Sequence, residues 1–318
     1  MHEELLVAAI APLVLGIVLD AAYPYHRGLL LAIHPVHTSY SMALSLARRF
    51  RGMGRTGGIA LWVIVVGSHL AIYGAALWAA WRLGILAWTL AAAYVVKVSM
   101  PIRLLVDQVR ETGRRLEDHD LEGARGVAQG LVRRDLRTAD AGHVGSAALE
   151  SLFESLVDGV TSPLLYYALM GPMGALLQRL SNTMDGAVGF RDPQFSEVGW
   201  FSAKVDTVLN YLPARLTALL EIASCGIGGS RRAARAYERH RRSTASLNAG
   251  HPMSAAAGCL GVALEKAGEY RLGDGDLPGP GDIARGLRLA MRTLCLAFAI
   301  AVPSIAACAL GAHLVWLS

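Results

Sequence analysis

Long stretches without charged side chains constrain this chain more than any other feature of its sequence. Residues 59–81 contain no Asp, Glu, Lys or Arg, and neither do residues 293–318. A run of about 20 apolar residues is long enough to cross a bilayer, and a helix satisfies its own backbone polar groups there. These two segments therefore predict membrane-spanning helices.

Four weaker segments have the same character. Residues 5–19 are uncharged but short; because no basic segment precedes them and no small-residue cleavage site follows, we interpret them as a retained first helix. Residues 85–98 return from the preceding span through a tight hairpin. Residues 159–178 combine an uncharged run with prolines and glycines, which predicts a broken or re-entrant helix lining a cavity. Residues 212–229 are a poorer candidate because charged residues interrupt them.

Composition agrees with a membrane protein. Hydrophobic residues make up 53% of the 318 residues and charged residues only 17%, whereas a soluble domain carries about 25% charge. The net charge is +5, almost all from arginine. The arginines cluster at residues 48–55, 103–137 and 231–242, which the positive-inside rule places in the cytoplasm, with the N-terminus outside. We therefore expect the positive charge to face the bilayer surface and not a nucleic acid.

These patterns predict an all-α, polytopic integral membrane protein with about four to six membrane-embedded helices, some of them broken or re-entrant. We expect residues 1–318 to form a single integral membrane domain. Within it, residues 101–158 are expected to form a helical cytoplasmic insertion, and residues 230–285 a cytoplasmic loop region rich in Gly and Pro near its end. Strand signals are nearly absent.

The four cysteines give no metal or redox signature. Cys225, Cys259, Cys295 and Cys308 form no CxxC pair and have no histidine at zinc-ligand spacing. We expect them to be small apolar core residues, in preference to a disulfide or a metal site.

Three acidic residues stand four apart before the uncharged segment at residue 159. Glu150, Glu154 and Asp158 would share one stripe of a continuous helix. Carboxylates that enter a membrane need a cation or a proton, and a magnesium ion that carries a nucleotide would suit their oxygens. The alternative is an ordinary solvated helix face.

A second polar group follows between residues 182 and 215. Asn182 and Asp185 are three apart, and Asp206 and Asn210 are four apart, so each pair can share a helix face; Arg215 lies further on. Mixed carboxylate and amide oxygens suit magnesium or a hydroxylated substrate. Helix capping explains such residues equally well.

Three further features carry weaker signals. The Asn248–Ala249–Gly250 run can expose backbone N–H groups to an anion. His34 and His37 are more often structural than functional. The arginines at 231–242 read as a membrane-surface anchor, with phosphate binding as the alternative. The chain has no P-loop, dinucleotide-binding or zinc-protease motif.

At these residues the chain resembles the cobalamin-biosynthesis membrane amide synthases, the adenosylcobinamide-phosphate synthase family. The resemblance covers most of the chain and is most specific at the following elements: Glu150–Ser151, Ser155–Leu156–Val157–Asp158–Gly159, Ser162–Pro163–Leu164, Asn182–Thr183–Met184–Asp185, Leu209–Asn210–Tyr211–Leu212–Pro213–Ala214–Arg215, Asn248–Ala249–Gly250 and His34–Pro35–Val36.

The resemblance implies a reaction and its reactants. It implies an ATP-dependent carbon–nitrogen ligase that joins the propionate carboxylate of adenosylcobyric acid to (R)-1-aminopropan-2-ol or its O-phosphate, with ATP and Mg²⁺ required and the corrinoid as substrate. It also implies a multi-pass protein of the cell membrane, lipid as its surroundings, no nucleic-acid partner, and association with other membrane enzymes of the late cobalamin pathway. A non-catalytic membrane sensor or a transporter of the same fold remains the alternative.

On this basis each polar residue receives an expected role. The expected catalytic residues are Glu154, Asp158 and Asp206. The expected metal ligands are Asp158, Asp185 and Asp206. The residues expected to bind substrate or nucleotide are Glu150, Asn182, Asn210, Arg215, Asn248 and His34.

Overall fold

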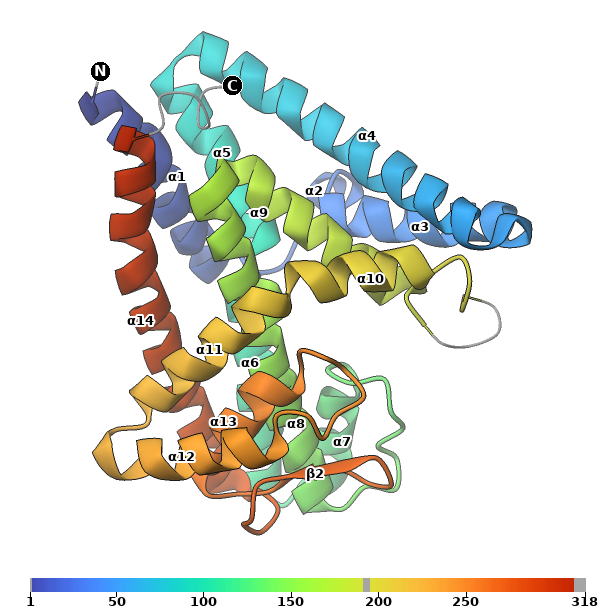
Figure 1. The fold of residues 1–318 in the computed structure, drawn as a ribbon, viewed down its shortest axis with the longest axis vertical. Helices are drawn as coiled ribbons and strands as arrows, with labels where there is room; N and C mark the ends of the chain where they lie inside the picture. Colours follow the sequence, from blue (N-terminus) through green and yellow to red (C-terminus); the bar gives the residue numbers. More distant parts are fainter. Residues whose placement is uncertain (1, 191–194, 312–318) are drawn as a thin grey trace. The chain divides into compact units, whose positions relative to one another are not determined.

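The computed structural model describes residues 2–190 and 195–311, and most of them are helical (Figure 1). The chain forms two compact units. The first unit comprises Met1–Pro101, Asp158–Leu209 and Ile300–Ser318, and the second comprises Ile102–Val157 and Asn210–Ala299. The final helix, α14 (Pro280–Gly311), begins in the second unit and ends in the first.

The other elements of the first unit follow chain order. They are α1 (His2–Ala22), α2 (Leu29–Ala32), α3 (Pro35–Phe50), the 3-10 turn η1 (Arg51–Met53), α4 (Gly54–Leu83), α5 (Ile85–Ser99), α9 (Ser162–Val188) and α10 (Trp200–Leu209). A π-helical turn, η2 (Val157–Thr161), precedes α9.

The other elements of the second unit are mostly shorter. They are α6 (Ile102–Glu117), α7 (Leu121–Gln129), α8 (Ala141–Leu156), α11 (Tyr211–Ser224), α12 (Ile227–His240), α13 (Gly250–Leu260), β1 (Leu264–Lys266) and β2 (Tyr270–Leu272). The two strands pair antiparallel in one small hairpin.

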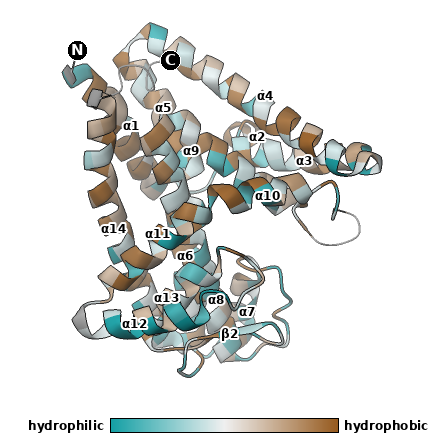
Figure 2. Cartoon of the chain, viewed as in Figure 1, coloured by the Kyte–Doolittle hydropathy of each residue, from teal (hydrophilic) through white to brown (hydrophobic). Residues whose placement is uncertain are grey.

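Five helical stretches of the described chain are long and apolar enough to cross a membrane: Glu3–Ala22, Pro35–Leu83, Ile85–Glu117, Ala141–Val188 and Pro280–Ala309. Their apolar side chains are widely exposed; on α4, for example, Ile72 and Trp78 are each 65% exposed. Figure 2 shows the hydrophobic colouring along α4 and α14. Exposed apolar surface of this extent suits contact with lipid. The expected all-α polytopic fold is confirmed, although the last seven residues of the expected final span lie outside the described chain.

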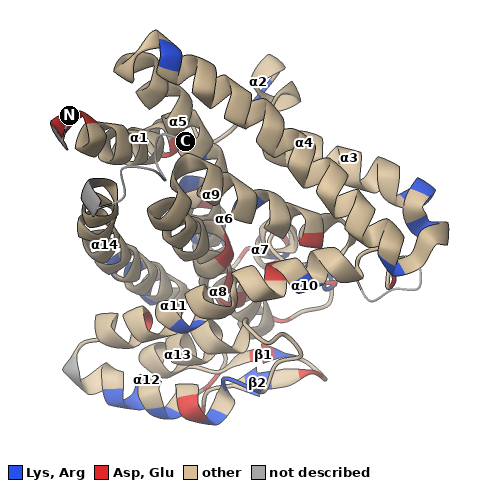
Figure 3. Ribbon diagram, turned by 45° about the horizontal axis from the view of Figure 1, so that its top comes forward, with Lys and Arg blue, Asp and Glu red and all other residues tan. Residues whose placement is uncertain are grey.

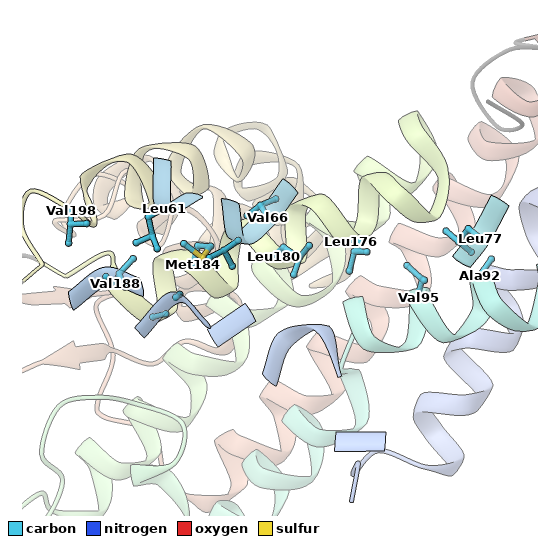
Figure 4. Packing of buried hydrophobic residues seen from close by; sticks show 14 of the residues in the cluster. Leu61, Val66, Leu77, Ala92, Val95, Leu176, Leu180, Met184, Val188 and Val198 are labelled. Carbon is cyan, nitrogen blue, oxygen red and sulfur yellow. The ribbon is translucent and has the colours of Figure 1, made fainter. Parts of the chain in front are cut away.

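The core of the first unit lies between helices α1, α3, α4, α5 and α9. Leu61, Val66 and Leu77 of α4 pack with residues of α3, α5 and α9 in one buried cluster (Figure 4). On α9, Leu176 and Leu180 are fully buried in this cluster. Packing of this kind fixes α9, which carries several of the polar residues singled out above.

A proline in α1 shows how this unit satisfies its backbone. Pro12 has no N–H, so the carbonyl of Ala8, four residues earlier, lacks its usual helical partner. The indole N–H of Trp88, on the adjacent α5, donates to that carbonyl oxygen at 3.0 Å. An unpaired carbonyl in lipid would cost several kcal/mol, so α5 completes the hydrogen bonding of α1.

The expected break within residues 159–178 is confirmed. Within α9, Met170 and Gly171 have non-helical backbone angles, and Gly171 has φ 64° immediately before Pro172. That conformation is open mainly to glycine, and the proline cannot continue the hydrogen-bond ladder. Two helical halves therefore meet at this point.

The second unit packs α13 against α11 and α12, and α8 against the hairpin. Its α6 and α7 contact each other. Several residues of α12 are arginines, which Figure 3 colours blue along its ribbon. The chain is non-regular from Gly273 to Gly279, within the expected Gly- and Pro-rich segment, and α14 already begins at Pro280.

The cysteine expectation is wrong. Cys225, directly after α11, and Cys259, in α13, form a disulfide with Cα atoms 5.5 Å apart. The sequence could not reveal this pairing because the two residues are 34 apart and meet only through the packing of α11 on α13. Cys295 and Cys308 are free and exposed on α14, not part of the core.

Candidate active site

Helices α9 and α10 of the first unit bring two of the expected polar residues into contact. The side-chain N–H of Asn182 donates to Oδ1 of Asp206 at 3.2 Å. The guanidinium of Arg179 donates to Oδ1 of Asn182 at 3.4 Å. The amide of Asn182 therefore bridges a cation and a carboxylate.

Arg179 is the central residue that the sequence analysis missed. Its Nε is shielded from solvent and has no hydrogen-bond partner among the described residues. The carboxylates of Asp158 and Asp206 are the charges that act on it most strongly. Arg179 directly follows the uncharged segment 159–178 and stands three residues before Asn182, and this helical spacing was the available signal. We define Arg179, Asn182, Asp206 and Asp158 as the α9–α10 cluster.

Asp185 lies on α9, one turn beyond Asn182. Its carbonyl accepts a hydrogen bond from the N–H of Gly189 at 2.8 Å, close to the end of the helix. A Cβ on Gly189 would come within 2.0 Å of Oδ1 of Asp185. The side chain is thus packed against a glycine, at the end of the same helix that carries the α9–α10 cluster.

Asp206 lies on α10 of the first unit, which ends at Leu209, and Asn210 occupies the N-cap position of α11 in the second unit. Their expected common helix face stays a prediction. Asn210 is buried, and its side chain makes no capping hydrogen bond to α11.

The carboxylate of Glu150, in the second unit, is surrounded by hydrogen-bond donors of the protein. Both of its oxygens accept from the Arg134 guanidinium at 2.7 Å. The hydroxyls of Ser146 and Tyr270 each donate to it at 2.6 Å. Glu150 as a whole is only 3% exposed. Residues of α8, of the hairpin and of the segment before α8 therefore hold a buried carboxylate with four charge-assisted hydrogen bonds.

Glu154 and Asp158 lie in different elements. Glu154 is exposed on α8, which ends at Leu156, and Asp158 is half-buried in the π-helical turn η2. Glu150 is buried, so the three carboxylates of the expected stripe have different surroundings.

Arg215 and Asn248 lie together in the second unit. The guanidinium of Arg215 donates to Oδ1 of Asn248 at 3.3 Å and to the carbonyl of Tyr211 at 2.5 Å. It also stacks on the ring of Tyr211, 3.4 Å from the centroid. These contacts hold the arginine in one orientation.

His34 begins α3 in the first unit. Its Nδ1 accepts from the N–H of Val36 at 3.2 Å, which caps the helix. Burial, together with the positive charges of His26 and Lys97, lowers the pKa of His34 to about 3. The ring is therefore neutral at physiological pH, as its role as a hydrogen-bond acceptor requires.

The resemblance implies that Mg²⁺ takes part in the reaction, so the positions of the carboxylates can be compared with the ligands that Mg²⁺ usually takes. Among the described residues, no group of three or more His, Cys, Asp or Glu side chains is placed to hold a metal ion. Magnesium commonly binds through one or two carboxylates together with substrate phosphates and water. Asp158 and Asp206 therefore fit an ion that arrives with a nucleotide better than an ion held by the protein alone.

Comparison with known proteins identifies the family. The family model described as CobD/Cbib protein matches residues 13–291. A relative from Aeropyrum pernix, named probable cobalamin biosynthesis protein CobD, is 48% identical over 96% of this chain and 95% of its own length.

Two further relatives cover most of the chain. The protein of the same name from Methanothermobacter thermautotrophicus is 36% identical over 83% of this chain and 87% of its own length. The cobalamin biosynthesis protein CobD of Pelobacter propionicus is 31% identical over 86% of this chain and 88% of its own length. No solved structure matches. The chain, a helical membrane protein with polar clusters on its helices, thus belongs to the CobD/Cbib family of cobalamin biosynthesis proteins.

Proposed function

We propose that this protein is an ATP-dependent ligase of the cell membrane. It joins the propionate carboxylate of adenosylcobyric acid to the amine of (R)-1-aminopropan-2-ol or its O-phosphate. The observation that carries the proposal is the α9–α10 cluster, in which Arg179, Asn182 and Asp206 interact on helices of a membrane protein of this family. Charged groups in such surroundings are costly and usually serve function.

The chemistry proceeds in two balanced steps. A carboxylate oxygen takes the γ-phosphoryl group of ATP, which gives an acyl phosphate and ADP. The amine nitrogen then attacks the acyl carbon, inorganic phosphate leaves, and the nitrogen loses its proton to a base. The phosphoryl transfer needs fixed positive charge more than covalent help from the protein.

The residues of the α9–α10 cluster suit these steps. Arg179 supplies a fixed positive charge for a carboxylate or phosphate oxygen. Asp206, oriented by Asn182, is a base for the proton of the amine. Asp158 and Asp206 would hold magnesium, which would neutralise phosphate charge when bound, and Asp185 is the third proposed metal ligand. Glu154, in the second unit, stays a predicted catalytic residue.

The test is amide formation by purified, folded protein with adenosylcobyric acid, ATP and each amine. We expect Asp158→Ala and Asp206→Ala each to lower the rate by about 10²–10⁴-fold, the usual effect of losing an acid–base group. Asp118→Asn, a change to an exposed carboxylate directly after α6, is the control and should retain the rate. Near-wild-type turnover in both alanine variants would reject this site, and wild-type protein that binds the reactants without consuming ATP would instead fit a non-catalytic role.

A further inference from the structure

A hollow in the second unit carries an inference about how the reactants are held. Its volume is about 530 Å³. It is formed by α11, the end of α12 and the loop that leads to α13. The residues that line it are Tyr211, Arg215, Tyr237, Arg241, Arg242, Thr244, Ala245, Ser246, Leu247 and His251. We call this hollow the arginine pocket.

The positive charge of the arginine pocket is not neutralised by the protein. Its lining includes Arg215, Arg241 and Arg242 and no Asp or Glu. Within the described part of the chain, no ion pair joins these three guanidinium groups to a carboxylate. The neighbouring Arg239, by contrast, pairs with Asp274 at 2.7 Å. Three cations around one hollow without a counter-charge call for an anion.

Another arginine of the 231–242 cluster, Arg232, has a structural role. Arg232 donates to the carbonyls of Gly258 and Cys259 at 2.6 and 2.7 Å, where it completes the C-terminal end of α13. A guanidinium at that end also interacts favourably with the helix dipole. The basic block is therefore not uniform: some members hold the fold, whereas Arg241 and Arg242 face the pocket.

Aromatic side chains fix the geometry of the arginine pocket. Arg215 stacks on Tyr211, and Arg241 lies over the ring of Tyr237 at 5.4 Å from the centroid. The hydroxyl of Tyr237 and Nδ1 of His251 are 2.8 Å apart. Stacked guanidinium groups lose little freedom when they bind a phosphate with two parallel hydrogen bonds.

The imidazole of His251 is affected by the positive charge of these three arginines. Burial, and after it the charges of Arg215, Arg241 and Arg242, lower the pKa of this imidazole to about 4. The ring therefore stays neutral at physiological pH, and the arginines supply the positive charge. The pocket also contains the hydroxyls of Thr244 and Ser246, which can donate to an anion.

We propose that the arginine pocket is a phosphate-binding subsite that holds a phosphoryl group of a reactant. This deepens the proposed function and rests on it for the identity of the reactant: the group belongs either to the nucleotide or to the O-phosphate of the amine. A lipid headgroup has the same chemistry, and tightest binding of the phospholipid would contradict the assignment to a reactant.

The experiment measures binding without turnover. Purified protein in a neutral detergent is titrated calorimetrically with inorganic phosphate, the non-hydrolysable nucleotide AMP-PNP, aminopropanol phosphate, unphosphorylated aminopropanol, and short-chain phosphatidylglycerol. We expect at least one phosphate-bearing probe to bind and aminopropanol to bind more weakly than its phosphate at this site. The probe that binds most tightly identifies the source of the phosphate.

Matched variants separate the pocket from general charge. Arg241→Gln/Arg242→Gln removes two pocket cations, whereas Arg231→Gln/Arg235→Gln removes two exposed cations of α12 outside the pocket. We expect the first variant to weaken the best probe by about tenfold or more, since a hydrogen bond to a charged group contributes about 1.5–3 kcal/mol. The second variant should bind as the wild type does. The single variant Arg242→Gln, at an exposed position, serves if the double variant does not fold.

The outcomes distinguish this inference from the proposed function. If no phosphate-bearing probe binds the wild type, or if both double variants weaken binding equally, the subsite is refuted. If Arg241→Gln/Arg242→Gln forms amide with an unchanged KM for ATP and amine, the subsite is refuted while the ligase stands. If phosphate binding depends on the pocket but no amide forms, the subsite stands and the ligase fails.

Discussion

Glu221 is the most unusual single residue of the second unit. It lies on α11 with 0% exposure, and neither carboxyl oxygen has a side-chain hydrogen-bond partner. Burial raises the pKa of this carboxyl well above 4.5. The proton therefore stays on Glu221 in the folded protein at pH values where an unfolded chain has released it.

This buried acid predicts a dependence of stability on pH. Below pH 4.5 both states are protonated, so the shifted pKa costs nothing; as the pH rises above 4.5 the unfolded state loses its proton and the folded state loses stability. Glu221→Gln cannot titrate. We expect the melting temperature of Glu221→Gln in detergent, relative to that of the wild type, to rise between pH 5 and 8. Each kcal/mol of difference in unfolding free energy should correspond to about 2–4 °C.

Glu238→Gln, at an exposed position on α12, is the control and should show the wild-type pH profile. A parallel profile for Glu221→Gln and wild type across this range would mean that Glu221 is ionised when folded.

Glu150 and Arg134 allow a structural role to be separated from nucleotide binding. Removing one partner leaves the other charge with too few contacts, and for fully buried pairs this costs about 3–5 kcal/mol; the cost is lower here because the Arg134 side chain is 19% exposed. We expect Glu150→Gln and Arg134→Met each to lower the melting temperature, and Glu150→Met/Arg134→Met to recover part of the loss. Calorimetry with AMP-PNP on the folded variants tests the expected binding role directly.

The exposed pair Asp135 and Arg137 provides the comparison, because its side chains are 55% and 87% exposed. Asp135→Asn should leave the melting temperature close to that of the wild type, because exposed ion pairs contribute little to stability. If Glu150→Gln is as stable as Asp135→Asn but no longer binds AMP-PNP, the nucleotide role is favoured over the structural one.

At the scale of elements, Pro12 and Trp88 join α1 to α5. Trp88→Phe removes the donor to the Ala8 carbonyl and should destabilise the protein by about 1–3 kcal/mol, the cost of leaving a buried acceptor unpaired. Pro12→Ala restores an N–H to α1, so it should reduce the effect of Trp88→Phe. A double-mutant cycle on melting temperatures measures this coupling; additive effects would contradict it.

Local sequence patterns predict the helices and their breaks well. The pair Gly171–Pro172 disrupts a helix wherever it occurs, and Gly84 ends α4 with φ 115°. Contacts between distant segments are a different matter. Glu150 meets Tyr270 across 120 residues and Cys225 meets Cys259 across 34, and nothing local specifies either pairing.

The polar residues of the site were recognisable only in part for the same reason. Asn182 and Asp206 lie 24 residues apart but meet because α10 packs back on α9. Arg179 was overlooked because it directly follows an uncharged segment, and a cation at that position usually indicates only where a membrane helix ends.

For the molecule as a whole, the side of the membrane on which α10 lies decides whether cytosolic ATP can reach Asp206. An uninterrupted span over residues 159–178 would place the following segment outside, whereas the arginines of α12 favour the cytoplasm. The break at Gly171 lets the chain enter and leave the bilayer on one side. We therefore predict that Lys204, exposed on α10, faces the cytoplasm.

The measurement uses single cysteines and a membrane-impermeant maleimide on vesicles of both orientations. In a Cys295→Ser/Cys308→Ser background that keeps the disulfide, Arg235→Cys marks the cytoplasmic side and Leu83→Cys, 82% exposed at the α4–α5 hairpin, marks the outside. Lys204→Cys should be modified from the same side as Arg235→Cys. Modification only from the side of Leu83→Cys would separate Asp206 from cytosolic nucleotide, and an ATP-dependent role for that residue could not stand.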